Sequence, residues 1–329
     1  MNSGAGRHSP EPRRVLLLGA TGTIGRATVR ALARRGHEVV CVVRGPATAP
    51  GQASVEFRQC DAADPDSLVR DGIRGERFDA LVSCMASRTG APADAWAIDH
   101  RAHVDALGAA RGAGVTHMVL LSAICVQKPL LAFQKAKLAF ESELIRSGLD
   151  WSIVRPTAFF KSLSGQVERL RRDKPFLVFG DGELTACKPI GDDDLGAYLA
   201  GCLDDESRRN RILPIGGPGP AITPRDQGER LFGLMGKPPR FRHVPVAMLD
   251  AIVGTLGAFG RVSPAMAAKA ELARIGRYYA TESMLVLDPV TGRYDVDATP
   301  SFGTETLFDY YARLVSGEAE AERGDHAVF

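Results

Sequence analysis

The sequence predicts an α/β fold: a doubly wound parallel sheet with a smaller, mainly helical C-terminal lobe. Two observations lead to this prediction. Short apolar runs alternate with helical segments over the first two thirds of the chain, and a glycine-rich turn joins the first run to the first helical segment. Strands that are apolar on both faces are typical of a parallel sheet covered by helices. The chain has 329 residues, 45% of them hydrophobic, so it can bury a substantial core.

Seven apolar runs are predicted to be the strands of this sheet. Turns or helical segments separate them, as expected for parallel strands joined by crossovers. The seven runs are residues 15–19, 38–44, 55–61, 78–86, 116–123, 150–156 and 211–217. After Pro218 the pattern changes to helical segments linked by proline turns, at 224–236, 245–260 and 264–280.

Composition and charge argue against several classes of protein. The 41 basic and 39 acidic residues give a net charge of +2, so no electrostatic feature favours a nucleic-acid partner. The six cysteines form no C-x-x-C pair, which is typical of a reducing compartment. Residues 1–13 are polar and lack the apolar run of a signal peptide. We therefore expect a disordered leader and a cytoplasmic protein.

A glycine motif, G-x-x-G-x-x-G, separates the first strand from the first helical segment. Gly19 is expected to allow a tight turn, Gly22 to let the backbone approach a pyrophosphate, and Gly25 to permit close packing of the helix. The N-terminus of that helix favours an anion. The residues expected to contact the phosphates are Gly19, Thr21, Gly22, Thr23, Ile24 and Gly25. The motif therefore predicts a Rossmann-type dinucleotide-binding domain, which we place at residues 14–217.

The end of the second strand favours NADPH over NADH. It carries Arg44 and no Asp or Glu, and a guanidinium suits a ribose 2′-phosphate that a carboxylate would repel. A solvated strand end is the alternative for Arg44. Asp61 closes the third strand, where it either binds the adenine amine or caps the following helix. Ala86, Ser122 and Pro156 lie at the ends of the next three strands and complete the predicted cofactor site.

Phe133 and Lys137 stand in the spacing F-x-x-x-K. This spacing matches the Tyr-x-x-x-Lys of short-chain dehydrogenases, in which the Tyr protonates the alkoxide that carbonyl reduction forms. Phe133 replaces that Tyr and cannot donate a proton. Lys137 lies one helical turn away on the same face and is expected to bind the nicotinamide ribose, whereas Lys135 points elsewhere. The pattern indicates a nicotinamide enzyme that does not carry out ordinary ketone reduction.

Four further segments are distinctive: SAICVQKPLLAFQKAKLAFE (122–141), VRPTAFFKSLSGQ (154–166), ATESMLVLDPVTGRYD (280–295) and ATPSFGTETL (298–307). Through them the chain resembles the NADPH-dependent divinyl chlorophyllide 8-vinyl reductases, which are atypical short-chain dehydrogenases related to NmrA-like and isoflavone-reductase-like proteins. The resemblance covers residues 14–314. It implies reduction of the C8 vinyl group of a divinyl chlorophyllide or protochlorophyllide to ethyl, with NADPH as hydride donor, in chlorophyll or bacteriochlorophyll synthesis.

This chemistry tolerates the missing hydroxyl at Phe133. Hydride added to an alkene conjugated with a tetrapyrrole leaves charge spread over the ring, so a strong adjacent acid is less necessary. Phe133 is also compatible with no catalysis, and two alternatives stay open. One is a non-catalytic NmrA-like protein that senses NADP or assists assembly. The other is an isoflavone-reductase-like enzyme that reduces a smaller substrate.

Ligands of open α/β sheets bind beyond the carboxyl ends of the strands. The loops 122–135 and 156–190 are therefore expected to line the pigment site, below a substrate lobe at 218–315. Phe159 and Phe160 are expected either to flank the flat ring of the pigment or to pack in the core. A Lys, preferably Lys128, is expected either to hold the propionate of the pigment or to lie at the surface. The candidate substrate and catalytic residues in these loops are Cys125, Gln127, Lys128, Phe159, Phe160 and Lys161.

Three other features are predicted to be structural. His100 and His103 lack the companions of a metal site, so no metal is expected. The acidic run 192–194 is expected to cap the helix that follows it. Residues 246–260 are too few for a comfortable membrane span, so a buried helix is expected, with a peripheral membrane contact as the alternative. Residues 316–329 are expected to form a flexible tail.

Overall fold

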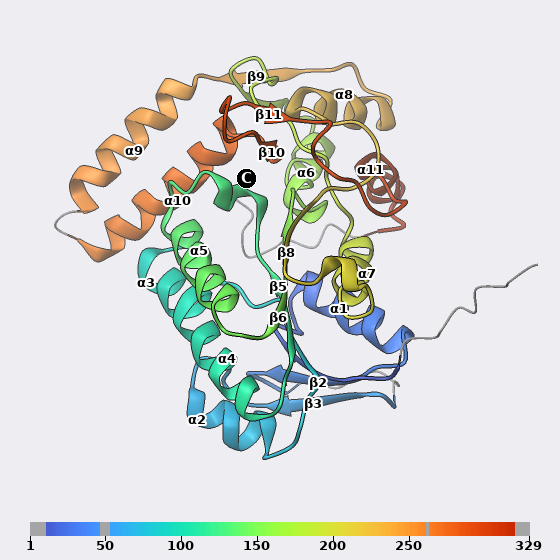
Figure 1. Ribbon diagram of the computed structural model, residues 1–329. Coiled ribbons are helices and arrows are strands. Elements are labelled where there is room, and N and C mark those ends of the chain that lie inside the picture. Colours follow the sequence, from blue (N-terminus) through green and yellow to red (C-terminus); the bar gives the residue numbers. More distant parts are fainter. Residues whose placement is uncertain (1–10, 47–52, 261–262, 320–329) are drawn as a thin grey trace, which may run out of the picture.

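The computed structural model describes residues 11–46, 53–260 and 263–319. Most of the predicted leader (1–13) and most of the predicted tail (316–329) lie outside the described residues. The main element is a seven-stranded, wholly parallel sheet in the order β3-β2-β1-β4-β5-β6-β8 (Figure 1). Its strands are β1 (Arg14–Leu18), β2 (Glu38–Val43), β3 (Val55–Gln59), β4 (Ala80–Ser83), β5 (His117–Leu121), β6 (Asp150–Pro156) and β8 (Arg211–Ile215). All seven predicted strands are present, and the predicted fold class is confirmed.

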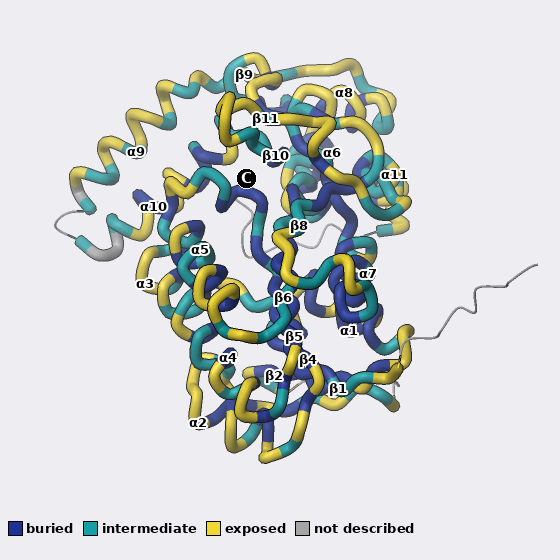
Figure 2. Tube along the Cα trace, viewed as in Figure 1, coloured by how far each residue is buried: buried dark blue, intermediate teal, exposed yellow. Residues whose placement is uncertain are grey.

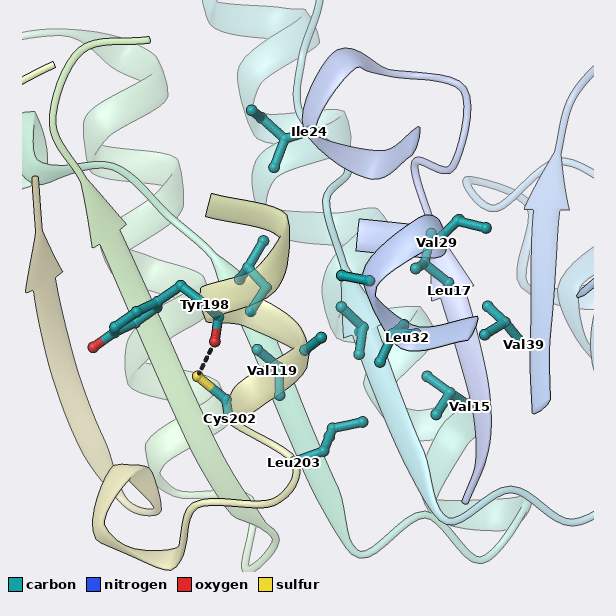
Figure 3. Close-up of a cluster of buried hydrophobic side chains, with 14 of the residues drawn as sticks. Val15, Leu17, Ile24, Val29, Leu32, Val39, Val119, Tyr198, Cys202 and Leu203 are labelled. Atoms are coloured by element: carbon teal, nitrogen blue, oxygen red, sulfur yellow. Dashed lines mark hydrogen bonds between the residues drawn. The ribbon is translucent and has the colours of Figure 1, made fainter. Parts of the chain in front are cut away.

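Helices cover both faces of the sheet, and alternate residues of each strand point to opposite faces. Leu17 of β1 packs with residues of α1 (Thr23–Arg34) and α7 (Asp192–Gly201) in one core cluster, part of which Figure 3 shows. Leu16 packs on the other face with residues of α4 (His103–Gly112) and α5 (Ala132–Ile145). Short helical segments complete this second layer: α2 (Pro65–Ser67), Leu68–Ile73, α3 (Pro92–Ala95) and Trp96–Ala102.

The C-terminal lobe packs around a third apolar cluster, to which residues 158–190 also contribute. A parallel pair joins β7 (Phe176–Phe179) to β9 (Phe241–Val244), so this part of the predicted nucleotide-binding domain packs with the lobe. The other elements of the lobe are α6 (Val167–Arg171), α8 (Pro224–Leu234), α9 (Val246–Gly260), α10 (Pro264–Thr281), β10 (Val286–Leu287), β11 (Tyr294–Asp295) and α11 (Leu307–Ser316). The three helices predicted after Pro218 are present, and the short strands of the lobe were not predicted.

The expectation that residues 246–260 form a buried helix is wrong. Together α9 and α10 form a helical hairpin at the edge of the molecule, and Figure 2 shows α9 largely in the exposed colour. Met248 is 48% exposed and Ile252 is 40% exposed. Apolar residues occur on all sides of α9, and contact with α10 buries only one of these sides. In the described part of the chain, no helix is both long enough and apolar enough to cross a membrane.

The start of α7 also differs from the prediction. Gly191 is its N-cap, and the three acidic residues 192–194 lie inside the first turn, where none of their side chains caps the helix. Their negative charges still interact favourably with the positive end of the helix dipole. The acidic run therefore stabilises the start of α7 through its charge and not as a side-chain cap.

Candidate active site

The glycine motif forms a tight turn between β1 and α1. Gly19 has a φ of +78°, and a Cβ atom there would lie 2.6 Å from the carbonyl carbon of Cys84 on the neighbouring strand end. A Cβ atom at Gly25 would lie 2.0 Å from the carbonyl oxygen of Gly19. The Gly22 amide closes the turn by donating to the same oxygen at 3.2 Å. Only glycine fits at residues 19 and 25 without displacing backbone, which agrees with the predicted roles.

The N-terminus of α1 fits an anionic group. Its N-cap is Gly22, and within the described residues no side chain caps this helix and no acidic residue lies in its first turn. Neither a side-chain cap nor an acidic residue of its own first turn therefore offsets the positive end of this helix. Lys161 adds a cation, because its Nζ donates to Thr23 Oγ1 at 2.9 Å. Lys161 was predicted to hold the substrate, and this contact places it beside the predicted phosphate loop.

Arg44 follows β2 directly and is exposed at the carboxyl edge of the sheet. Asp61, just after β3, is also exposed, and its Oδ1 accepts a hydrogen bond from the Ala63 amide at 3.0 Å. The alternative in which Asp61 caps the next helix is wrong. Asp64 is that cap, since its Oδ1 accepts from the amides of Asp66 and Ser67. The adenine role of Asp61 stays a prediction.

Lys137 lies on α5 and forms a buried ion pair. Its Nζ lies 3.0 Å from Oδ1 of Asp99, whose side chain is fully buried. The Ser87 hydroxyl donates to Asp99 Oδ2 at 2.5 Å, and the Ser87 amide donates to Oδ1 at 3.2 Å. Burial alone would raise the pKa of Asp99, but the charge of Lys137 and these hydrogen bonds hold it below the ordinary value. The carboxylate therefore fixes the ammonium of Lys137 in one position.

The other residues near α5 are placed as follows. Lys135 is exposed, as predicted, while Phe133 is half-buried against the lobe. The hydroxyl of Ser122 donates to Oε1 of the buried Glu141, and its amide donates to Val154 O at 2.8 Å. The hydroxyl and the amide of Ser122 are thus engaged within the protein, and its cofactor role stays a prediction. The small residue Ala86 is exposed just after β4.

The loop after β5 is clamped to the lobe by its two polar residues. Gln127 Nε2 donates to Leu285 O at 2.5 Å, and its Oε1 accepts from the Leu287 amide at 2.9 Å. Lys128 Nζ lies 2.7 Å from both carboxylate oxygens of Glu282. The geometry does not support the prediction that Lys128 holds a substrate carboxylate, because its ammonium is already paired with the carboxylate of Glu282.

An apolar cavity of about 290 Å³ lies beyond the carboxyl ends of β5 and β6 and under the lobe. Cys125 and Phe159, predicted to contact substrate, line it together with Pro156, which was predicted to contact the cofactor. Phe160 is not among the lining residues; it is buried and stacks on Tyr310, with 5.5 Å between ring centroids. Of the two predicted roles of Phe160, the structure therefore supports packing in the core and not contact with substrate.

His103 is a structural residue. Its Nδ1 lies 2.8 Å from the Ile98 carbonyl oxygen, so that nitrogen donates, and its Nε2 accepts from the Ser83 hydroxyl at 2.8 Å. Burial, helped by the charge of Lys137, lowers the pKa of His103 to about 4. No group of side chains in the described ranges could hold a metal ion.

Comparison with known proteins decides the family. A family model described as NAD(P)H-binding matches residues 19–206. The divinyl chlorophyllide a 8-vinyl-reductase of Oryza sativa subsp. indica, a chloroplastic protein, is 48% identical over 98% of this chain and 83% of its own length. The chloroplastic protein of that name from Arabidopsis thaliana is 45% identical over 96% of this chain and 80% of its own length. The chain belongs to the divinyl chlorophyllide a 8-vinyl-reductase family.

Membership of the 8-vinyl-reductase family confirms the predicted resemblance and the prediction of an NAD(P)H-dependent oxidoreductase. It also favours the reductase over the two alternative functions. A solved NADPH-dependent quinone oxidoreductase from Escherichia coli, in complex with NADPH, has a TM-score of 0.64 and 18% identity over 92% of this chain and 99% of its own. This likeness supports the Rossmann-type fold.

Within this 8-vinyl-reductase fold, sequence reasoning missed the partner of Lys137. Asp99 lies in the run AWAIDH, where a single carboxylate follows small and apolar residues. An acidic residue at that place in a helical segment is the signal that could have pointed to a buried ion pair. Glu141, four residues after Lys137, was missed in the same way; it pairs with Arg155 and accepts from Ser122.

Proposed function

We propose that this chain reduces the C8 vinyl group of a divinyl chlorophyllide or protochlorophyllide to an ethyl group, with NADPH as the hydride donor. The observation that carries the proposal is the identity of 48% along nearly the whole chain with a protein named for this reaction. The site is consistent with it. A fixed Lys137 lies on α5 without a phenol at residue 133, and an apolar cavity follows the strand ends.

NADPH supplies the hydride when it is bound, and the chain's own residues hold and orient it. Residues 19–25 and Lys161 receive the pyrophosphate at the positive end of α1. Lys137 donates to the nicotinamide ribose, and Asp99 keeps it in place. Arg44, exposed at the end of β2, binds the 2′-phosphate and selects NADPH over NADH.

The cavity receives the reacting edge of the pigment. Its volume of about 290 Å³ is just below the range of small-molecule sites, which span about 300–1,000 Å³. It therefore holds the vinyl-bearing edge, and the rest of the flat ring lies over the rim, where Leu184 is 47% exposed. Phe159 and Ala158 form part of the wall near β6. The largely apolar walls keep most water away from the reacting carbons.

The outer face of α9 provides a contact with a membrane surface. Met248 and Ile252 expose apolar side chains there. The exposed Arg242 precedes the hairpin on β9, and the exposed Lys269 lies on α10. An apolar face with basic flanks suits an interface that contains anionic lipid. A hydrophobic pigment dissolved in that membrane would reach the enzyme by this route.

The test is an aerobic assay of the purified protein with NADPH and divinyl chlorophyllide a, without added flavin or iron. Pigment chromatography should show the 8-ethyl product. Lys137→Ala should slow the reaction at least about tenfold at limiting NADPH, because one charge-assisted contact is lost. Lys135→Ala is the matched control, since Lys135 is exposed on the same helix, and it should react as the unmodified protein does. An unchanged pigment together with normal NADPH binding would overturn the proposal and favour a sensing role.

A further inference from the structure

Helix α5 has no Tyr at residue 133, but tyrosines from other elements lie near the candidate site. Tyr278 and Tyr279 on α10 and Tyr294 on β11 all lie near the loop that follows β5 or the residues that clamp it. The Tyr278 hydroxyl donates to the Cys125 carbonyl oxygen at 3.0 Å. The Tyr294 hydroxyl donates to Glu282 Oε2 at 2.7 Å. These two hydroxyls are committed to strong acceptors, which leaves Tyr279 as the candidate donor to a substrate.

Tyr279 faces the cavity, and its hydroxyl has a weak partner. The side chain lines the cavity together with Cys125 and Pro156. Its Oη lies 4.0 Å from Cys125 Sγ, and a thiol is a poor hydrogen-bond acceptor. The residue is 39% exposed, so solvent reaches part of it. Burial raises the pKa of Tyr279 well above its usual range.

The same loop connects Tyr279 with the predicted position of the nicotinamide. Cys125 follows β5 and Pro156 ends β6, and ligands of such sheets lie beyond these strand ends. Burial raises the pKa of the Cys125 thiol, and the positive charge of Lys137 acts on that thiol in the opposite sense. Helix α5, which carries Lys137, packs against residues 124–127 of this loop, and Tyr279 on α10 approaches Cys125 of the same loop.

We propose that Tyr279 is the general acid of the vinyl reduction and supplies from α10 the proton that Phe133 cannot give; this inference rests on the proposed function. Hydride from NADPH forms a C–H bond at the terminal vinyl carbon, and the π electrons move to the internal carbon and into the ring. The O–H bond of Tyr279 breaks as its proton forms a C–H bond at the internal carbon. The products are the ethyl group, NADP⁺ and a phenolate, which regains a proton from water.

The stereochemistry of protonation tests this role. In deuterium oxide with unlabelled NADPH, a fixed donor places deuterium at one of the two hydrogen positions of the ethyl methylene, and nuclear magnetic resonance of the product reads that position. In Tyr279→Phe the proton must come from water. We expect kcat to fall about 100-fold, at the lower end of what general acids contribute, and deuterium to appear at both positions. A Tyr that only supports the fold would not change this distribution.

Two further measurements make the result unambiguous. Fluorescence titration of Tyr279→Phe with NADPH alone and with pigment alone should give dissociation constants within about twofold of the unmodified protein, because a single weak contact is lost. Tyr278→Phe is the matched control. It removes the neighbouring hydroxyl and its bond to Cys125 O, so it should lower the melting temperature while protonation stays confined to one position.

Each outcome separates the two proposals. If the unmodified protein forms no 8-ethyl product, the proposed function fails and the role of Tyr279 fails with it. If the unmodified protein reduces the pigment and Tyr279→Phe does so at the same rate with protonation at one position, only the role of Tyr279 is overturned. Loss of pigment binding in Tyr279→Phe with protonation still confined to one position would also overturn it.

Discussion

The pair of Lys137 and Asp99 gives the sharpest test of how the site is built. The side chain of Lys137 is 11% exposed and that of Asp99 is fully buried, so removing one partner leaves the other as an uncompensated buried charge. Breaking a buried pair in this way costs about 3–5 kcal/mol. We expect Asp99→Asn to lower the free energy of unfolding by about 3 kcal/mol, the smaller value, because Lys137 retains some contact with solvent.

A double-mutant cycle separates this pair from its surroundings. Lys137→Met alone should also be destabilising, because Asp99 is then left without its cation. Asp99→Asn combined with Lys137→Met should lose less than the sum of the single losses, by at least about 1.5 kcal/mol. Urea denaturation followed by circular dichroism at pH 7 measures all four proteins. Losses that add to within about 0.5 kcal/mol would refute the reasoning, since residues that do not interact behave in this way.

The direction of the Asp99 pKa shift sets the effect of pH on this pair. The folded pKa of Asp99 is lowered, so the pair contributes stability at neutral pH and loses it as the pH falls through that folded value. The stability of Asp99→Asn should therefore depend less on pH in the acid range than that of the unmodified protein. A steeper dependence would contradict the assignment.

Three further predictions concern pH, cofactor and membrane. Burial lowers the pKa values of His103 and His117 to about 4, so these residues take up protons in the unfolded chain at a higher pH, near 6.5, than in the folded protein. Each His should therefore reduce the free energy of unfolding by about 2 kcal/mol between pH 7 and pH 5. An equal free energy of unfolding at pH 7 and pH 5 would contradict this. Arg44→Ala should raise the dissociation constant for NADPH about 10- to 100-fold by losing a charge-assisted bond, and an equal loss for NADH in the same titration would exclude a 2′-phosphate role. Ile252→Asp should abolish flotation with vesicles that contain anionic lipid while detergent-dispersed pigment is still reduced, whereas Met248→Gln, which stays uncharged, should bind vesicles more weakly; unchanged flotation of both variants would rule out α9 as the contact.

The strands of the main sheet could be predicted because a strand buried on both faces has one apolar signature whatever its neighbours are. The lobe gave no such signal. β7 is four residues long and pairs with β9, which lies more than sixty residues further on, and β10 and β11 have two residues each. Pairings so short and so distant in sequence depend on tertiary contacts that local patterns do not contain.

The same limit applies to the site. Gly19 and Gly25 were predictable because the motif and the turn it forms are local. Asp99 lies 38 residues before Lys137 and Tyr279 lies 154 residues after Cys125, so only the folded chain brings each pair together. Lys128 shows the converse. Its residue type suited a carboxylate, and the sequence could not say that the carboxylate belongs to Glu282 of the lobe.

The apolar segment of α9 was misjudged for a physical reason. Apolar residues on all sides of a helix usually indicate burial in a core, and the charged residue Asp250 pairs with Arg277 on α10. The pattern is the same when the second apolar surface is another molecule or a lipid phase. Sequence alone therefore predicts that α9 needs an apolar neighbour but does not identify it.

The most direct measurement of the central claim follows the hydride itself. Purified protein is incubated with divinyl chlorophyllide a and with NADPH that carries deuterium at one or the other face of nicotinamide C4, and mass spectrometry of the pigment follows. We predict that one of the two labelled cofactors gives an 8-ethyl product with one deuterium on the terminal carbon of the ethyl group. An 8-ethyl product that contains no deuterium from either cofactor would contradict direct transfer to the vinyl group.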